Sequence, residues 1–516
     1  MSDHLLTHPD REAGDLAAAL GWAEVVLGPP VAVERTVLDT FDGHLHAAGL
    51  RLELRSGPAT ELVLLDRAGA PSAHLPVDAP PRVAGDLPPG PFAARVAAAT
   101  GGRGLLPVLH LSSRLRTGHR RDRRAKATVT VELHTHLAAA GARPARAALP
   151  AWAAEVHGAL GHDAALQQVV DRLAGRGFAT EPGDVVTLVA AALGVSLGGR
   201  AASPTVPMFP GEHAREAFRR VLLNLTDTIE ANLLGTIDDL DPEFLHELRV
   251  AVRRSRSVLS RARGVLPEDV RAHQRAELGW LSELTGPARD LDVFLIEWDG
   301  YLSPMEADAS AALVPVRAEI DRRRRLAHDV LADALRSDRY EEMVAGWERW
   351  LRDAGEPGIG PGRQPVGPLM AERLAAAQAR LLRRGRKITP SSPPQSLHDL
   401  RKDAKRLRYL IECFGSLLPG KPRKAFVQRL KALQDNLGSH QDAEVHVDLL
   451  RELAETLHAE EGLDAATLLA MGQLTEVLDR RRLAEREAFA DRFAAYDTKA
   501  TARALEALVD HARSVG

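Results

Sequence analysis

Apolar and polar positions alternate differently in the two parts of the chain. Before about residue 200, short runs rich in Val, Leu and Thr switch between apolar and polar residues, which is typical of half-buried β-strands. These runs are Val31–Leu38, Leu50–Arg55, Glu61–Leu65 and Thr128–Leu133. Turn-rich sequence such as Pro71–Pro91 separates them, and the helical pattern of Ala164–Leu173 follows. We therefore predict an α+β domain over residues 1–200.

After Pro207 the pattern changes to long stretches of Ala, Leu, Arg and Glu with few β-branched residues. Short Gly and Pro breaks interrupt these stretches, and one longer break at residues 354–368 contains five Gly and four Pro. This composition is typical of a linker between helical segments. We predict an all-α domain over residues 207–516.

The linker separates two copies of one motif, H-x-x-R-x-x-x-[KR]-R-x-R, which begin at His246 and His398. The offset between the histidines is 398 − 246 = 152, and the later residues Asp290 and Asp442 repeat it, since 442 − 290 = 152. Conserved register over two separate motifs predicts a duplicated helical unit. The copies extend over about 207–353 and about 369–516, each with several antiparallel helices.

Each motif places its basic residues on one face of a helix. Positions i, i+3, i+7 and i+10 fall within about 80° of arc. The two faces are His246, Arg249, Arg253 and Arg256, and His398, Arg401, Lys405 and Arg408. The opposite faces are apolar, with Leu248, Val252, Val258 and Leu259 in one copy and Leu400, Leu407, Leu410, Ile411 and Phe414 in the other. Each helix is thus predicted to be anchored by one side and cationic on the other.

The basic residues are concentrated although the net charge of the chain is −3. Residues 249–263 contain six Arg and no acidic residue, and residues 380–431 contain 15 basic residues against 3 acidic ones. Solvated helix faces usually mix both signs, because like charges one turn apart repel each other. Arg presents a fork that matches phosphate oxygens. With only 4% aromatic residues for base stacking, the chain favours a phosphate chain over nucleic acid.

Other residues admit two interpretations. The repeated histidines are structural or donate to phosphate, in which case protonation would strengthen binding at mildly acidic pH. Asp290, Asp292, Asp442 and Glu444 are metal carboxylates or, as we favour, helix caps and partners of nearby arginines. The pairs His44 with His46 and His134 with His136 have strand-like spacing but lack a third metal ligand. We expect no metal and no cofactor.

One cysteine, Cys413, excludes disulfides within the chain and fits a reducing compartment. Residues 1–10 carry no secretory pattern, and the longest apolar stretch, Val185–Leu197, is shorter than the roughly 18 to 20 residues that span a bilayer. We expect a cytoplasmic protein without membrane contact.

The paired motifs, with the sequences Gly286-Pro-Ala-Arg-Asp-Leu-Asp-Val293 and Lys405-Arg-Leu-Arg-Tyr409, resemble the CHAD domain, the conserved-histidine α-helical domain. The resemblance covers about residues 207–516. It implies two four-helix bundles with a basic cavity or surface that binds inorganic polyphosphate, and an association with polyphosphate granules. The implied binding residues are His246, Arg249, Arg253, Arg254, Arg256, His398, Arg401, Lys402, Lys405, Arg406 and Arg408, with Arg323, Arg324, Lys421, Arg423, Lys424 and Lys431 as further members.

The first 200 residues are similar to a CYTH domain, the triphosphate-tunnel fold, in Leu38–Asp42, Leu45–Leu50, Leu52–Arg55 and Ser113–Arg116. The family's first-strand ExExK motif has no match in residues 1–30, and its later acidic strand is reduced to Ala154-Glu-Val-His157. Without those carboxylates Mg²⁺ would lack its usual ligands. We interpret the domain as a divergent, noncatalytic CYTH-like fold in which Arg55, Arg114 and Arg116 are the candidate phosphate contacts.

The sequence thus predicts a two-domain protein that binds inorganic polyphosphate without breaking a bond. Two alternatives stay open: a CYTH-type triphosphatase or polyphosphate-processing enzyme, and a helical scaffold or nucleic-acid-associated protein. The sequence does not specify the oligomeric state or the preferred length of the polyphosphate chain.

Overall fold

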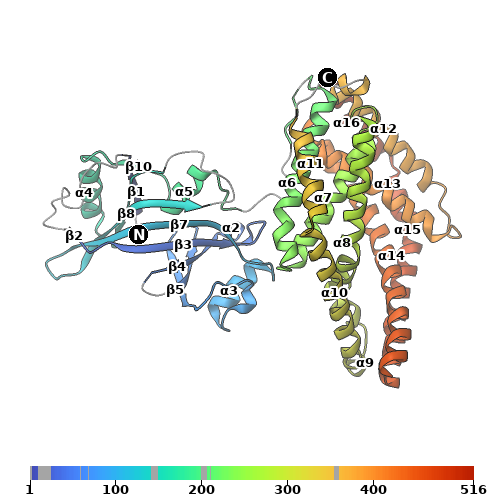
Figure 1. The fold of residues 1–516 in the computed structure, drawn as a ribbon, viewed down its shortest axis with the longest axis horizontal. Coiled ribbons are helices and arrows are strands. Elements are labelled where there is room, and N and C mark those ends of the chain that lie inside the picture. The colour runs from blue at the N-terminus through green and yellow to red at the C-terminus, as the bar shows by residue number, and fades with distance from the viewer. Residues whose placement is uncertain are drawn as a thin grey trace. The chain divides into compact units, whose positions relative to one another are not determined.

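An antiparallel β-sheet dominates the first of two units of the chain, Met1–Ala202, and helices build the second unit, Ser203–Gly516 (Figure 1). The computed structural model describes residues 3–9, 25–57, 60–67, 69–140, 149–198, 206–209, 211–353 and 360–515. Residues 354–359 of the predicted linker lie outside this described part. The predicted fold class, α+β followed by all-α, is confirmed.

In the described residues of the first unit, the sheet contains ten strands in the order β10-β1-β9-β8-β7-β3-β4-β5-β6, with β2 paired to β7. The paired strands all run antiparallel there. The strands are β1 (Asp3–His8), β2 (Val25–Leu27), β3 (Val31–Asp39), β4 (Leu50–Ser56), β5 (Thr60–Asp66), β6 (Pro71–Pro76), β7 (Leu106–Arg121), β8 (Ala127–Ala140), β9 (Trp152–Gly158) and β10 (Ala179–Glu181). The four predicted strands are confirmed as β3, β4, β5 and part of β8. The sheet agrees with the antiparallel β architecture that a CYTH-like fold implies.

Strand β6 contradicts one prediction. The turn-rich interval Pro71–Pro91 begins with β6, so the prediction of turns is wrong for residues 71–76. β6 lies at the end of the strand order, where half of the backbone groups of a strand need no partner. An edge position therefore accommodates its two prolines.

Helices cover both faces of the sheet. On one face, α3 (Pro91–Thr100) and α4 (Asp163–Ala174) pack into separate apolar clusters, and α4 confirms the predicted helix. α5 (Val185–Leu193) packs with Val37, Leu109 and Leu111 into another cluster. Asp184 caps its start by accepting a hydrogen bond from the backbone N–H of Thr187. The short helix α2 (His44–Ala47) follows β3.

The second unit consists of helices that alternate in direction with short connections. The first repeat contains α6 (Ala214–Ile237), α7 (Pro242–Arg261), α8 (Glu268–Leu302), α9 (Ala307–Ala312), α10 (Val314–Leu335) and α11 (Asp338–Arg352). The second contains α12 (Val366–Gly385), α13 (Pro394–Cys413), α14 (Gly420–Glu461), α15 (Ala465–Tyr496) and α16 (Lys499–Ser514). Within the described ranges, no helix combines the length and apolar character needed to cross a membrane.

The two repeats share one hydrophobic core. A single cluster of buried side chains includes residues of α6, α7 and α8 together with residues of α12, α13 and α14. At its centre the rings of Phe218 from the first repeat and Phe414 from the second lie 4.8 Å apart. α7 and α13, which carry the duplicated motif, contact each other directly. The duplication therefore produces one folded unit in which the two motifs are neighbours.

Candidate polyanion-binding site

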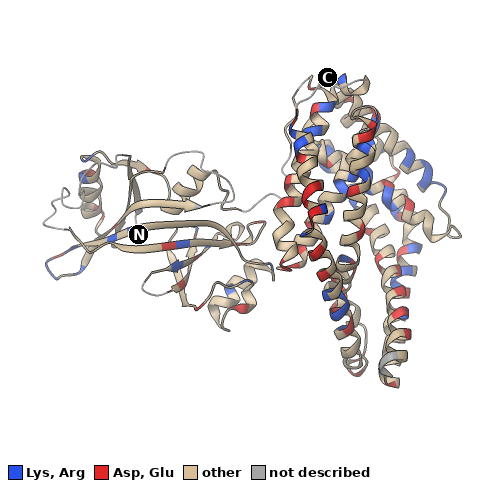
Figure 2. Cartoon of the chain, in the orientation of Figure 1, with Lys and Arg blue, Asp and Glu red and all other residues tan. Residues whose placement is uncertain are grey.

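The apolar faces predicted for α7 and α13 are confirmed. Leu248, Val252, Val258, Leu259, Leu400, Leu407, Leu410, Ile411 and Phe414 all have 0% exposure. Burial of these side chains fixes the rotation of both helices, so that the basic residues lie away from the core. Arg256 and Lys402 are exposed, and the other basic residues of the motifs are half-buried. Figure 2 shows that Lys and Arg residues are interspersed with Asp and Glu along the helices of the second unit.

Each repeat forms the same ion pair between its motif helix and the next helix. Nη2 of Arg249 lies 3.6 Å from Oδ1 of Asp290, and Nη2 of Arg401 lies 3.1 Å from Oδ1 of Asp442. The four residues obey the 152-residue offset. These two aspartates thus pair with arginines, as we favoured over a metal site.

A glycine stands beside the arginine in each pair. A Cβ added at Gly286 would lie 3.3 Å from Nη1 of Arg249, and one added at Gly438 would lie 4.0 Å from Nη2 of Arg401. The repeated glycine therefore leaves room for the guanidinium against α8 and α14.

The two histidines have neighbours that also correspond between the repeats. Nδ1 of His398 is hydrogen-bonded to Oε1 of Gln441. Burial, followed by the positive charges of Arg289 and Arg253, lowers the pKa of His246 to about 4. Since 441 − 289 = 152, Gln441 and Arg289 occupy equivalent positions. His246 is therefore neutral near pH 7 in the free protein, contrary to the expectation that its protonation adds charge there.

Charges from both repeats act on the same groups. Burial, followed by Arg401 of the same helix and Arg253 of α7, lowers the pKa of Lys405 to about 7. Burial lowers the pKa of Arg249 as well, and Arg401 contributes to this. Because the basic residues of α7 and α13 lower the pKa of one another, their side chains lie close together across the contact between the two helices. The two basic faces thus converge.

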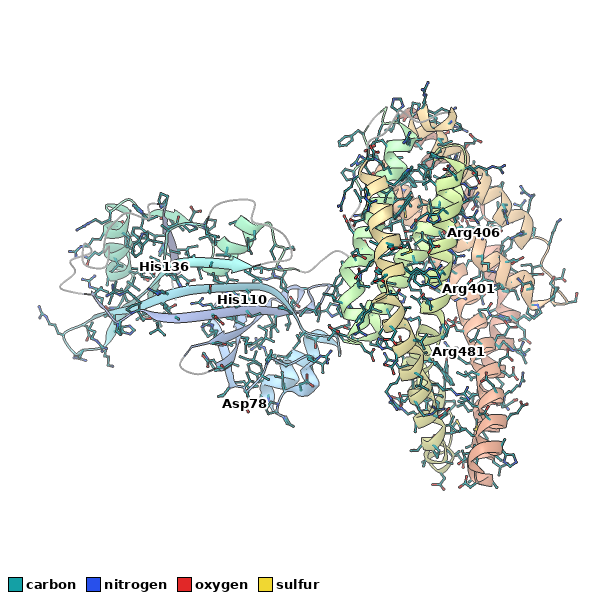
Figure 3. The ribbon with its side chains drawn as sticks, viewed as in Figure 1. Asp78, His110, His136, Arg401, Arg406 and Arg481 are labelled. Carbon is teal, nitrogen blue, oxygen red and sulfur yellow. The ribbon has the colours of Figure 1, made fainter. Side chains whose placement is uncertain are left out.

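A pocket of about 300 Å³ opens between α13 and α14, on the second-repeat side of this contact. Its lining consists of Arg401, Lys405, Arg408, Gln434, Asp435, Gly438, Ser439 and Asp442. In the described part of the chain, Nε of Arg401 and both polar atoms of the Gln434 amide are buried without a hydrogen-bond partner. Unpaired buried donors are costly, so a polar ligand with acceptor oxygens would stabilise them. Figure 3 labels Arg401 on the second unit.

Arg254 and Arg408 flank the same two residues. Nη2 of Arg254 lies 2.9 Å from Oε2 of Glu412, and Nε of Arg408 lies 3.2 Å from Oε1. Both guanidinium groups also lie over the ring of Tyr409, at 5.8 and 5.6 Å. Glu412 thus neutralises part of the charge at this edge.

Several candidate site residues predicted from the sequence do not line this pocket. Arg406 pairs with Asp403 at 3.2 Å. Arg323 pairs with Glu319 and Glu452, and Arg324 donates to Asp239 and Asp292. Lys421, Lys424 and Lys431 are exposed on α14, and Arg423 donates to the carbonyl of Gly415. Glu444 accepts from Gln441 at 3.2 Å.

Three residues of the site were missed in the sequence. Arg289 and Gln441 were not singled out, although the 152-residue offset relates them and each lies near the histidine of its repeat. Gln434 carries no signal, because an isolated Gln in a helix is common and only the fold shows its burial at 5% exposure.

Charged residues also gather on the β-sheet beside the start of α5, where they neutralise one another. Nη1 and Nη2 of Arg35 lie 3.6 Å from Glu155 and 3.6 Å from Glu132. Arg55, a candidate phosphate contact, donates to Glu53 at 2.8 Å. Of the other two candidates, Arg116 donates to the carbonyl of Gly28 and Arg114 is exposed.

Of the two predicted histidine pairs, only His134 and His136 lie on a strand, β8. His44 and His46 lie on α2, so their assignment to a strand is wrong, and Nε2 of His44 lies 3.0 Å from Asp42. His134 is fully buried, whereas His136 is exposed and has a φ of 53°. Figure 3 labels His136 in the first unit.

A different set of side chains could hold a metal ion. Ligand atoms of Glu132, His134 and Glu155 lie within 4.8 Å of one another. Burial raises the pKa of Glu155, but the hydrogen bond with His134 and the charge of Arg35 outweigh it and hold that pKa below its ordinary value. Arg35 thus already compensates both carboxylates.

Both copies of the duplicated motif lie in a region that matches a known protein family. Residues 220–451 match the family model described as "CHAD domain". Two curated relatives, uncharacterized proteins Rv2226 and MT2285 of two Mycobacterium tuberculosis strains, are each 27% identical over 206 residues, which is 39% of this chain and 39% of theirs. The match therefore spans well under half of their length.

Three solved structures are also similar. The CHAD domain from the plant Ricinus communis is 26% identical, with a TM-score of 0.48, over 58% of this chain and 96% of its own. PptA from Streptomyces chartreusis is 20% identical, with a TM-score of 0.42, over 55% and 100%. The PH1819 protein from Pyrococcus horikoshii OT3 is 10% identical, with a TM-score of 0.24, over 37% and 96%.

Proposed function

Residues 220–451 form a CHAD domain, and from this premise we propose that the chain binds inorganic polyphosphate at the convergent basic faces of α7 and α13. CHAD domains are linked with polyphosphate binding in general. The observation that carries the proposal is the pocket lined by Arg401 and Lys405, where Nε of Arg401 is buried without a hydrogen-bond partner and the charge of Arg253 from the first repeat acts on Lys405. Consecutive phosphate groups offer acceptor oxygens and negative charge to these donors.

The proposed interaction needs no catalytic step and no cofactor. The domain holds the polymer by charge and by bidentate hydrogen bonds from arginine, and association with polyphosphate granules would follow from that affinity. Binding of a flexible polyanion releases its condensed counterions, so the affinity depends steeply on salt.

A salt titration of the full chain with long-chain polyphosphate tests the proposal. We expect the double variant Arg401→Gln with Lys405→Gln to bind at least tenfold more weakly and to reduce the log–log salt slope by about one unit or more. The matched control, Arg480→Gln with Arg492→Gln on the exposed side of α15, removes the same charge and should change affinity less than twofold. Equal losses in both double variants would exclude a localised site. Competition by RNA at equal phosphate concentration would favour the nucleic-acid alternative.

A further inference from the structure

A second group of arginines lies outside the convergent faces, and we name it the α12 arginine cluster. It consists of Arg261 at the end of α7, Arg373, Arg380 and Arg384 on α12, and Arg406 on α13. On α12 these residues are spaced by seven and four positions, which places them on one helix face. Asp403 lies roughly 160° around α13 from Lys405, so the cluster occupies a different side of that helix.

One buried carboxylate organises three of these arginines. Asp403, whose side chain is 3% exposed, accepts from Nε of Arg380 at 3.0 Å and from Nη1 of Arg384 at 2.8 Å. Its other oxygen accepts from Nη1 of Arg406 at 3.2 Å. The three guanidinium groups remain about 40% exposed and keep further N–H donors beyond those used by Asp403. Asp403 thus holds the guanidinium groups of three arginines close together.

Within the described ranges, the remaining two arginines form no direct ion pair. Among the described residues, none forms an ion pair with Arg261, and its Nε is buried without a hydrogen-bond partner. Burial and the charges of Arg406 and Arg380 lower the pKa of Arg261. Nη1 of Arg373 is likewise buried without a partner in the described part of the chain, although its Nη2 donates to the carbonyl of Arg263 at 3.2 Å.

Charge counting gives the cluster an excess of three positive charges. Five arginines face two carboxylates, Asp403 and the exposed Glu372. Unpaired like charges of this kind destabilise a fold unless a ligand compensates them. Three convergent guanidinium forks match the oxygens of a phosphate group, which carries about two negative charges near neutral pH.

The duplication does not explain this arrangement. The first-repeat equivalents of Arg380, Arg384 and Asp403, 152 residues earlier, are Thr228, Asn232 and Ala251. The cluster therefore exists only in the second repeat, joined by Arg261 of the first. A site maintained without the symmetry of the two motifs has a ligand requirement of its own.

We propose that the α12 arginine cluster is a second anion site, separate from the convergent faces, that takes a compact phosphate-bearing group such as a diphosphate. The proposal does not rest on polyphosphate binding at α7 and α13, because four of its five arginines contribute nothing to that site. Free diphosphate and the terminal groups of a longer phosphate chain share the chemistry that the cluster recognises.

The test uses the full chain with Arg401→Gln and Lys405→Gln, which weakens the convergent faces, and titrates it with pyrophosphate by calorimetry. We expect saturable binding that Arg261→Gln weakens at least tenfold and Arg261→Lys at least threefold, because Lys keeps the charge but loses the fork. The matched control Arg383→Gln removes one charge from the exposed side of α12 and should change affinity less than twofold.

Thermal melting distinguishes a variant that has lost binding from one that has lost its fold. Arg261 is repelled by its neighbours, so Arg261→Gln should leave the Tm unchanged or raise it. The proposal is overturned if the background variant shows no saturable pyrophosphate binding, if both Arg261 variants bind as tightly as the background, or if Arg383→Gln loses as much affinity as Arg261→Gln. Long-chain polyphosphate in the same background identifies the source: sensitivity to Arg261→Gln with pyrophosphate alone supports a free diphosphate, and sensitivity with both supports recognition of any terminal phosphate group.

Discussion

Nη2 of Arg401 donates to Oδ1 of Asp442 at 3.1 Å, and both residues line the pocket formed by α13 and α14 of the second repeat. In the equivalent pair, Nη2 of Arg249 lies farther from Oδ1 of Asp290, at 3.6 Å. Both carboxylates are about half exposed, at 44% and 56% of their side chains. In the free protein they offset part of the positive charge that an incoming polyanion would meet.

Neutralising such a carboxylate should therefore strengthen binding. We expect Asp442→Asn to raise polyphosphate affinity about three- to tenfold at low salt, because the amide removes a repulsive charge of the order of 1 kcal/mol. Calorimetric titration would measure the change. Asp448→Asn, on an exposed position of the same helix, is the matched control and should alter affinity less than twofold. Weaker binding by Asp442→Asn would mean that the ion pair holds Arg401 in its binding position.

Lys405 should control the pH dependence of binding. Its pKa of about 7 in the free protein would rise beside a polyanion, so binding takes up a proton and affinity increases as the pH falls from about 9 to about 7. We expect Lys405→Gln to lose most of this dependence in titrations between pH 6 and 9. His246, with a pKa of about 4, gains a proton only at lower pH or through binding itself.

The comparison variant for this experiment is His246→Gln with His398→Gln. It should keep the dependence between pH 7 and 9. If the histidine variant loses that dependence and Lys405→Gln keeps it, the histidines and not Lys405 are the titrating groups.

The same lysine should limit stability. Its pKa is lowered from 10.5 in the unfolded chain to about 7, so the unfolded state binds more protons between these values and the free energy of unfolding falls as the pH drops from about 10 to 7. We expect Lys405→Gln to raise the Tm by about 2 °C or more at pH 7, corresponding to about 1 kcal/mol. Lys402→Gln, at an exposed position, should leave the Tm within about 1 °C. A lower Tm for Lys405→Gln at pH 7 would contradict the repulsion inferred from the structure.

The two repeated glycines should respond differently to alanine. At Gly438 an added Cβ fits at ordinary contact distance from Arg401, so Gly438→Ala should stabilise α14 by about 0.5–1 kcal/mol and leave that guanidinium in place. At Gly286 the Cβ would lie 3.3 Å from Arg249, so Gly286→Ala should displace that guanidinium and weaken polyphosphate binding severalfold. Thermal melts and titrations of both variants check this difference. Identical binding by the two variants would show that Arg249 tolerates the displacement.

Much of the helical unit could be predicted because its sequence contains two independent patterns: the helical spacing of apolar residues and the 152-residue offset between the repeats. The helical spacing of Leu248, Val252 and Leu259 fixes which side of α7 is buried, and the 152-residue offset transfers that assignment to α13. The convergence of the two faces could not be predicted, because it depends on the contact between α7 and α13 rather than on either helix alone. The partners of Arg324 illustrate the same limit: Asp239 is 85 residues away and Asp292 is 32 residues away.

In the first unit, the alternation of apolar and polar residues predicted where several strands lie, but it did not predict which side chains contact each other. The histidines at 44 and 46 have the spacing of a strand, yet Asp39 accepts from the backbone N–H groups of Leu45 and His46 and stabilises a helical turn. The pairing of Arg35 with Glu132 and Glu155 joins β3, β8 and β9, and no local pattern reveals such a contact.

The shared core also defines what one repeat is. Phe218 and Phe414 each complete their burial against the other half of the duplication, so neither repeat contains a finished interior of its own. The repeats relate to each other as the subunits of an obligate homodimer whose chains have been joined end to end. Covalent joining removes the concentration dependence of such a dimer, and it frees each half to diverge, as the arginines confined to α12 illustrate.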